Sequence, residues 1–280
     1  MKKLLPLILL TFLYGCSSFF YFPTKYFYAD PKQHNVAYDD IDFKSTDGTD
    51  LHGWFMYDKS YEKDKKKKKK GLILFFHGNA QNITSHWLNL GWMVKDGYDI
   101  FIFDYRGYGL SKGQANQQGL NKDSIAALNW AHAKSKEYPK FIVYAQSLGG
   151  TVSMRAMKDI DFKSDIDLYV LDSTFSSYQD IAFDKLKNAG VFVALSPLAY
   201  ILVSDEYGPY KNLDQFKMPI LMIHGNKDVV VPYKFGEEIY KKLKTEKKWW
   251  WTVEDGSHTD VFHPKHLQYR AKFLDFLEKI

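Results

Sequence analysis

A short apolar run that ends abruptly at a serine is the feature that most constrains the fold of this chain. The residues Phe141–Gln146 are mostly β-branched or aromatic, which is typical of a buried strand. Ser147, Gly149 and Gly150 follow, and apolar residues then recur at helical spacing. The sequence therefore predicts a strand, a tight turn and a helix. Such a turn strains the serine backbone and places its hydroxyl at a helix N-terminus, which favours developing negative charge.

Ala145 occupies the position at which a G-x-S-x-G turn usually has its first glycine. This position requires a small side chain because the returning helix packs against it, and alanine meets that need. A small-x-Ser-x-Gly string is also typical of an ordinary helix N-cap. The interpretation of Ser147 as a nucleophile therefore depends on finding an acid and a base elsewhere in the chain.

Two later segments supply such partners. Asp228 stands just beyond an apolar, strand-like run at 219–224, and His258 lies in the loop after a second such run, Lys248–Val253. The chain order Ser147, Asp228, His258 is that of the α/β-hydrolase fold and differs from the chymotrypsin-like and subtilisin-like orders. In such a triad the imidazole takes the serine proton, and the carboxylate orients the imidazole.

Asp172 is the alternative to Asp228 as the acid. It ends the strand-like run Leu168–Asp172, and a carboxylate at this place reaches the histidine in some hydrolases of this fold. Its other interpretation is a cap for the turn at 173–174. Both assignments remain open on the sequence alone.

The oxyanion hole is predicted from two backbone N–H groups. Leu148 follows the nucleophile and supplies one, and Asn79 supplies the other, because it follows the buried run Gly71–Phe76 and the dipeptide His-Gly. His77, which precedes Gly78, is interpreted as structural rather than catalytic.

The remaining pattern indicates one α/β domain, which suits a chain of 280 residues. Strand-like runs alternate with helical patterns at 116–134, 147–157 and 264–280. This alternation favours a mostly parallel sheet with helices on both faces. Runs at 39–44 and 51–56, joined through Asp47 and Gly48, predict an antiparallel hairpin at the start.

Three strings together resemble the α/β-hydrolase superfamily, and more closely its small-capped branch. They are His-Gly-Asn-Ala at 77–80, Asp-Tyr-Arg-Gly-Tyr-Gly-x-Ser at 104–111 and Ser-Leu-Gly-Gly at 147–150. The segment 171–175 is similar as well. The resemblance implies an eight-stranded, mostly parallel sheet flanked by helices, with a short cap inserted after the sixth strand. It also implies ester or thioester hydrolysis without metal or organic cofactor, as in monoacylglycerol and lysophospholipid lipases, protein depalmitoylases and esterases.

Two further segments have open interpretations. Asp104 and Arg106 are expected to be structural and could pair to fix the loop at the pocket rim. The insertion at 175–217 contains a long apolar run, which would either line an acyl pocket as a lid or simply pack beside the sheet. We favour the lid.

The N-terminus predicts export and lipidation. Residues 1–15 combine two lysines, an apolar core and a small residue before Cys16, as in a secretory signal peptide. Leu-Tyr-Gly-Cys at 13–16 resembles the lipobox of bacterial lipoproteins, which implies a lipid on Cys16, the only cysteine. Residues 16–37 are then a tether, and 38–280 the hydrolase domain. Serine at 17 implies, by resemblance, retention at the outer membrane, facing the periplasm.

The positive charge is concentrated in one loop. The net charge is +5, and the segment 58–70 alone has eight lysines and three acids. The lysine run at 65–70 is interpreted as a solvated loop, with contact to anionic lipid as the alternative. A nucleic-acid partner is disfavoured because an exported enzyme lies outside the cytoplasm and the segment offers no interleaved aromatic platform. The three tryptophans at 249–251 are expected to be buried along a strand.

Three functions compete at this stage. The leading hypothesis is a membrane-tethered serine hydrolase that cleaves acyl esters or thioesters of lipid-like substrates. The second is a serine peptidase of the same fold, which the short apolar insertion disfavours. The third is a non-catalytic envelope lipoprotein, which the complete set of Ser147, Asp228, His258 and the His-Gly-Asn string disfavours.

Overall fold

The computed structural model describes residues 21–64 and 66–280. The predicted signal peptide and Cys16 lie outside the described residues. No helix within these ranges is long and apolar enough to cross a bilayer.

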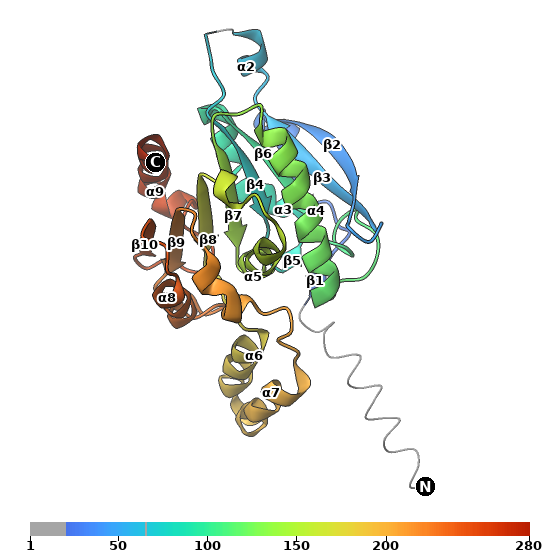
Figure 1. Ribbon diagram of the computed structural model, residues 1–280, viewed down its shortest axis with the longest axis vertical. Coiled ribbons are helices and arrows are strands. Elements are labelled where there is room, and N and C mark those ends of the chain that lie inside the picture. The colour runs from blue at the N-terminus through green and yellow to red at the C-terminus, as the bar shows by residue number, and fades with distance from the viewer. Residues whose placement is uncertain (1–20, 65) are drawn as a thin grey trace.

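An eight-stranded sheet forms the centre of the protein, in the order β10-β9-β8-β7-β4-β6-β3-β2 (Figure 1). The pairs β2–β3 and β3–β6 are antiparallel and all other neighbours are parallel. The predicted fold and opening hairpin are therefore confirmed. The strands are β2 (Ala37–Lys44), β3 (Asp50–Tyr57), β4 (Gly71–Phe76), β6 (Tyr98–Asp104), β7 (Phe141–Gln146), β8 (Leu168–Asp172), β9 (Ile220–Gly225) and β10 (Lys248–Val253).

Helices cover both faces of the sheet, as the alternation of patterns predicts. The α-helices are α2 (Ser60–Lys63), α3 (Ile83–His86), α4 (Gln117–Ser135), α5 (Leu148–Ala156), α6 (Tyr178–Lys187), α7 (Ala199–Leu202), α8 (Tyr233–Lys242) and α9 (Gln268–Lys279). Short 3-10 helices connect them: η2 (Pro31–His34), η3 (Trp87–Asn89), η4 (Gly91–Asp96), η5 (Met157–Asp159), η6 (Lys163–Asp165), η7 (Gly190–Leu198), η8 (Pro209–Gln215) and η9 (Pro264–His266).

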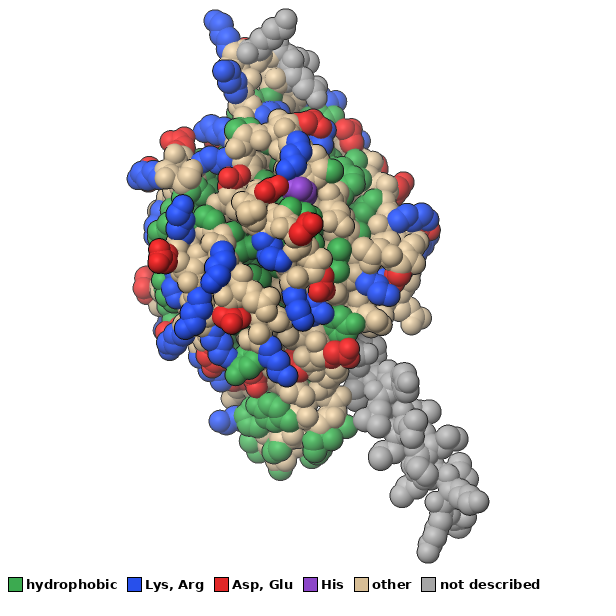
Figure 2. Space-filling model, viewed as in Figure 1, with side chains coloured by type: hydrophobic (Ala, Val, Ile, Leu, Met, Phe, Trp, Pro, Cys, Tyr) green, Lys and Arg blue, Asp and Glu red, His purple; other side chains and the backbone are tan. Residues whose placement is uncertain are grey.

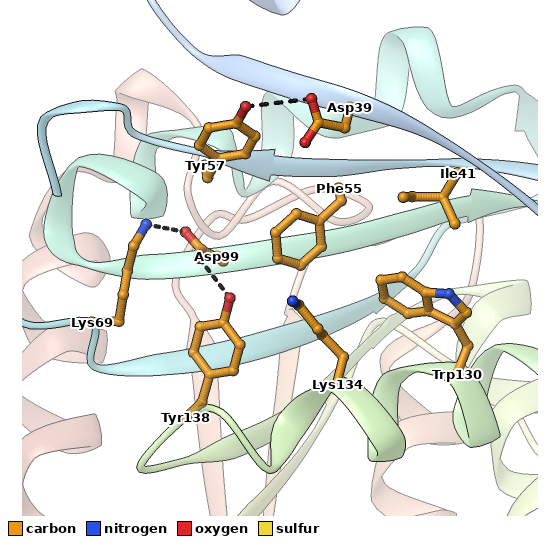
Figure 3. A pocket seen from close by; sticks show the side chains of 9 residues that line it. All are labelled: Asp39, Ile41, Phe55, Tyr57, Lys69, Asp99, Trp130, Lys134 and Tyr138. Atoms are coloured by element: carbon orange, nitrogen blue, oxygen red, sulfur yellow. Dashed lines mark hydrogen bonds and ion pairs between the residues drawn. The ribbon is translucent and has the colours of Figure 1, made fainter. Parts of the chain in front are cut away.

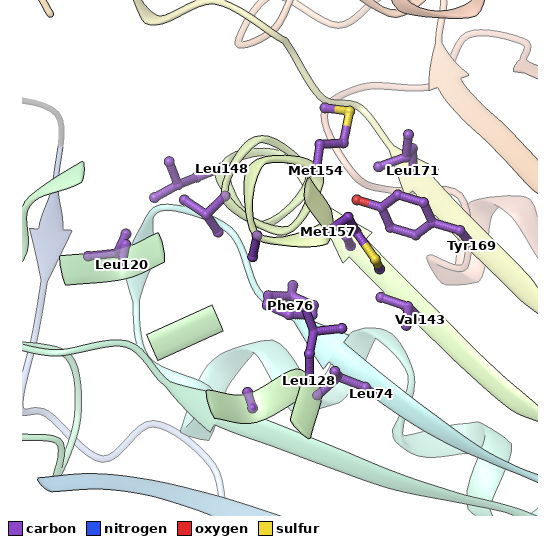
Figure 4. Close-up of a cluster of buried hydrophobic side chains, with 14 of the residues drawn as sticks. Leu74, Phe76, Leu120, Leu128, Val143, Leu148, Met154, Met157, Tyr169 and Leu171 are labelled. Atoms are coloured by element: carbon purple, nitrogen blue, oxygen red, sulfur yellow. The ribbon is translucent and has the colours of Figure 1, made fainter. Parts of the chain in front are cut away.

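Alternate residues of each central strand enter different cores. In β4, Leu74 and Phe76 pack with α4, α5 and α8, whereas Ile73 and Phe75 pack with η4 and α9. Figure 4 shows the first cluster, where Leu128 of α4 lies next to Leu74 and Phe76 of β4. Because β4 is buried on both faces, it must be apolar at every position, which explains the unbroken run in the sequence.

The insertion after β8, the sixth strand of the sheet, forms a cap of short helices. It contains α6, η7 and α7, which lie beyond the carboxyl ends of the parallel strands, whereas η8 returns beside the sheet next to α5 and α8 (Figure 1). The lysine-rich loop with α2 lies at the opposite end of the molecule. Along β10, Trp251 is buried, while Trp249 and Trp250 are partly buried against the two different cores.

The expected pair between Asp104 and Arg106 does not form. Arg106 instead donates from Nη2 to Asp123 of α4 at 2.7 Å and to Asp47 of the β2–β3 turn at 3.0 Å. Asp104 is fully buried and accepts the backbone N–H of Ile83 at 3.0 Å, and burial raises its pKa to about 7. The two side chains therefore stabilise the loop separately. Breaking a buried ion pair such as Arg106–Asp123 typically costs about 3–5 kcal/mol.

The packed part of the chain extends before the predicted domain boundary at 38. Tyr21 is buried, and β1 (Phe22–Pro23) pairs in parallel with β5 (Ala80–Gln81). The side chain of Asn82 donates to the carbonyl oxygens of Thr24 and Tyr26 at 3.0 and 2.8 Å. Residues 21–37 therefore belong to the folded unit. Sequence alone did not reveal this, because short irregular segments have no periodic pattern.

Candidate active site

Ser147 lies in a strained turn between β7 and α5. Its φ is 52°, a left-handed conformation that residues other than glycine rarely adopt, and its backbone N–H donates to the carbonyl of Asp172 at 2.9 Å. Helix α5 begins at the next residue, Leu148. The turn therefore has the geometry that presents a serine hydroxyl at a helix N-terminus.

The two glycines after the serine allow this turn to pack closely. A Cβ on Gly149 would collide with the backbone carbonyls of Phe76 and His77, and one on Gly150 would collide with Thr174. Helix α5 thus lies directly against the ends of β4 and β8. Thr174 also donates from Oγ1 to the Ser147 carbonyl at 2.7 Å.

Asp228 and His258 are in direct contact. Nδ1 of His258 is 2.7 Å from Oδ2 of Asp228, and the other carboxylate oxygen accepts the N–H groups of Val230 and Val231, each at 2.8 Å. The loops after β9 and β10 meet because these strands are parallel neighbours. Residues 30 positions apart are thereby joined by a hydrogen bond.

The carboxyl group of Asp228 is ionised in this environment. Burial opposes its charge, but hydrogen bonds from His224 and His258 outweigh burial and hold its pKa well below the usual value. An ionised carboxylate only accepts hydrogen bonds, so Nδ1 of His258 carries the proton. Nε2 is then the basic nitrogen, as a general base requires.

Asp172, the alternative acid, has other partners. Its Oδ2 accepts from Tyr144 and from Gln146, both at 2.9 Å, and its Oδ1 accepts from Ser173 at 3.1 Å. Burial raises its pKa. The geometry therefore favours Asp228 as the partner of His258.

Asn79 lies beside Ser147 at the end of the loop that follows β4. Asn79, Ser147 and Leu148 all line one cavity. A Cβ on Gly78 would lie 3.7 Å from the Cβ of Ser147, so glycine keeps the space next to the serine open. The N–H groups of Asn79 and Leu148 therefore remain the predicted oxyanion donors.

The side chain of Asn79 is held by two groups that the sequence did not point to. Its Oδ1 accepts from the Tyr108 hydroxyl at 2.9 Å and from the backbone N–H of Phe22 at 3.2 Å. Tyr108 comes from the loop after β6 and Phe22 from β1. The N-terminal segment is therefore a structural part of the site, and Phe22 also lines the cavity.

His77 has the structural position that we expected. It is fully buried, its Nδ1 is 2.7 Å from the carbonyl oxygen of Gly78, and its ring stacks on His86 with centroids 4.9 Å apart. Burial lowers its pKa well below the usual value, so the ring is neutral. Tyr105 donates to the His77 carbonyl at 2.9 Å and fixes the same loop.

An apolar cavity of about 670 Å³ adjoins Ser147. One wall comes from the cap and the other from the loops after β4 and β9. The lid interpretation of the insertion is consistent with this arrangement, since η7 and α7 contribute directly to the lining. The lining residues are Phe22, Asn79, Ser147, Leu148, Phe175, Ile181, Ala182, Lys185, Leu186, Leu195, Leu198, Ala199, Leu202, Val203, Val230 and Val231.

A second, smaller cavity of about 400 Å³ lies between β3 and the end of α4 (Figure 3). Most of its polar side chains bond to one another: Tyr57 to Asp39 at 3.3 Å, and Tyr138 and Lys69 to Asp99. None of the predicted site residues lines it. In residues 21–64 and 66–280, no group of three or more His, Cys, Asp or Glu side chains is arranged to hold a metal ion.

Comparison with known proteins agrees with this fold. A family model described as serine aminopeptidase, S33, matches residues 67–201. The uncharacterized protein YfhR of Escherichia coli K12 is 32% identical over 263 residues, which is 93% of this chain and 86% of YfhR. The α/β-hydrolase domain-containing protein WAV2 of Arabidopsis thaliana is 31% identical over 262 residues. The match covers 89% of this chain and 81% of WAV2.

The solved structures agree at the level of the fold. The esterase Pf2001 of Pyrococcus furiosus superposes with a TM-score of 0.71 at 20% identity, over 93% of this chain and 98% of the esterase. The chain belongs to the α/β-hydrolase superfamily, and it is a hydrolase.

His224 is the main residue of the site that sequence reasoning missed. It is fully buried in β9, and its Nε2 lies 2.8 Å from the Val231 carbonyl and 3.4 Å from Oδ2 of Asp228. The signal was present, because His224 is the one polar residue in an apolar strand that leads to Asp228.

We expect Asp228→Asn to lower kcat on p-nitrophenyl butyrate by about 10⁴, because an amide no longer holds the correct tautomer of His258. Asp172→Asn, the matched control, should retain kcat within about ten-fold of wild type. Steady-state kinetics on both folded variants, checked by circular dichroism, decide between the two acids. The reverse ranking would assign the acid to β8.

We expect Tyr108→Phe to lower kcat about ten-fold with little change in KM. Loss of the hydroxyl loosens Asn79, and misplacing an oxyanion donor costs less than the 10²–10³ of removing it. Tyr138→Phe is the matched control, since it removes a tyrosine hydrogen bond at the far end of the molecule. Equal kcat values for the two variants would contradict a positioning role for Tyr108.

Proposed function

We propose that the protein is a serine hydrolase that cleaves esters or thioesters of lipid-like acyl groups. Ser147 is the nucleophile, His258 the general base and Asp228 the acid, and the N–H groups of Asn79 and Leu148 stabilise the oxyanion. The observation that carries the proposal is the apolar cavity of about 670 Å³ between Ser147 and the cap.

In the proposed mechanism His258 takes the hydroxyl proton through Nε2 as Ser147 Oγ attacks the acyl carbon. The carbonyl oxygen gains negative charge and is stabilised by the two N–H groups. His258 then gives the proton to the leaving alcohol or thiol, and an acyl-Ser147 ester remains. Water, activated by the same imidazole, releases the acid and restores the serine. Asp228 stays ionised throughout and stabilises the charged imidazole.

The lining of the cavity supports an acyl substrate over a peptide. Its side chains are almost entirely aliphatic or aromatic, and Lys185 is the one charged group among the lining residues named above. No carboxylate in that set is available to bind the amino group of a peptide substrate. The motifs shared with acylglycerol lipases and depalmitoylases point the same way, although the matching family model is described as an aminopeptidase.

The third hypothesis, a non-catalytic envelope lipoprotein, is disfavoured by the backbone at Ser147. A positive φ at a non-glycine residue costs of order 1–3 kcal/mol and persists only where the surrounding structure enforces it. Glycines at 149 and 150 and the hydrogen-bonded Asp228–His258 pair accompany it. A scaffold without catalytic function would not require the strained serine, the two glycines and the Asp228–His258 pair together.

Covalent labelling tests the assignment of Ser147 as the nucleophile. A fluorophosphonate probe should label the wild-type protein and leave Ser147→Ala unlabelled, because the reagent requires an activated serine. Among substrates, p-nitrophenyl acyl esters should be cleaved at least 10²-fold faster than amino-acid anilides. No labelling of folded wild-type protein would reject the hydrolase assignment, and faster anilide cleavage would favour the peptidase.

We further propose that the protein is anchored in the bacterial envelope through a lipid on Cys16, at the outer membrane facing the periplasm. The support is the signal-like segment 1–15 and the lipobox-like string that ends at Cys16. Cells fed a tagged fatty acid should incorporate it into wild type, whereas Cys16→Ser should remain unlabelled and leave the membrane fraction. Equal labelling of both would contradict the anchor.

A further inference from the structure

The mouth of the cavity is surrounded by apolar side chains that are exposed to solvent. Several of these side chains line the cavity and are nevertheless 40–60% exposed, and two neighbours that do not line it are more exposed still, Ile201 at 72% and Val229 at 83%. We name this set the apolar rim: Phe22, Leu195, Leu198, Ile201, Leu202, Val229 and Val230.

The rim differs from the rest of the surface. Figure 2 shows hydrophobic side chains gathered at the cap end, while charged side chains of both signs are scattered over the remainder of this face. Contiguous exposed apolar surface at a ligand entrance therefore indicates a partner that covers it.

The point at which the described chain begins, next to the rim, bears on which partner this is. The chain enters the described structure at Tyr21, immediately before the rim residue Phe22. Four residues separate Cys16 from Tyr21, and this stretch spans at most about 18 Å when fully extended. A lipid on Cys16 therefore keeps Phe22 close to the bilayer surface, which leaves little freedom for the cap to turn away.

The charge distribution fits the same orientation. The lysine-rich loop lies at the end of the molecule opposite to the cap, so it points away from a bilayer that contacts the rim (Figure 1). Near the rim, Lys185 lines the cavity, and its Nζ donates to the Val229 carbonyl at 2.9 Å. The contact is thus mainly apolar, and anionic lipid is not required for it.

We propose that the apolar rim docks on a lipid bilayer, with the cavity mouth facing the lipid, so that acyl substrates pass from the membrane into the cavity. This inference rests on the proposed function, because it takes the anchor at Cys16 and the lipid-like substrate from there. An apolar acyl chain then moves between two apolar environments without crossing water, which removes the cost of its hydration.

The test compares two substrates on the full-length protein in vesicles of phosphatidylcholine and phosphatidylglycerol. One is a fluorogenic oleoyl ester held in the vesicles, and the other is soluble p-nitrophenyl butyrate. The double variant Ile201→Asp/Val229→Asp changes two rim residues outside the cavity lining. Leu267→Asp is the matched control, since Leu267 is 55% exposed at the start of α9, away from the cap.

We expect the double variant to lower the ratio of vesicle to soluble activity at least ten-fold, while its soluble activity stays within two-fold of wild type. Leu267→Asp should leave the ratio unchanged. An unchanged ratio in the double variant would overturn the docking, and so would a rim-dependent dimer detected by light scattering. Failure of wild type to cleave the soluble ester would instead reject the proposed function.

Discussion

Close backbone packing at the start of α5 is the constraint on which the rest of the site depends. Gly149 and Gly150 let the helix lie against the ends of β4 and β8, and the Asp172 carbonyl holds the N–H of Ser147. The serine therefore adopts a φ of 52°, which an unsupported turn would not keep. Because two strands and one helix enforce this geometry, the hydroxyl has a defined place before any substrate binds.

Electrostatic interactions determine the protonation of the acid and the base in the site. Burial would neutralise Asp228, yet His224, His258 and two backbone N–H groups keep it charged, and this charge assigns the proton of His258 to Nδ1. Asp172 lies in the same region but is occupied by Tyr144, Gln146 and Ser173. Two carboxylates near one histidine are thus distinguished by their hydrogen-bond partners rather than by position in the chain.

The substrate side of the site is built from segments outside the central sheet. The cap supplies an apolar wall, and the N-terminal segment contributes Phe22 and fixes Asn79 through a backbone hydrogen bond. If Cys16 carries a lipid, the segment that leads to the anchor also supports the oxyanion loop. Only a few residues of chain would then separate the lipid anchor from Phe22, whose backbone N–H supports Asn79.

The sequence by itself determined the sheet, the helices on both faces, the hairpin and the site candidates, because periodicity and motif spacing are local properties. Strands such as β4 are apolar throughout, and Gly149 and Gly150 mark the turn directly. Only the tertiary structure decided the contacts between distant segments. It placed Arg106 on Asp123 and Asp47 instead of Asp104, brought His224 to Asp228, and included residues 21–37 in the folded unit. These contacts depend on how loops meet in space, which no repeating pattern along the chain records.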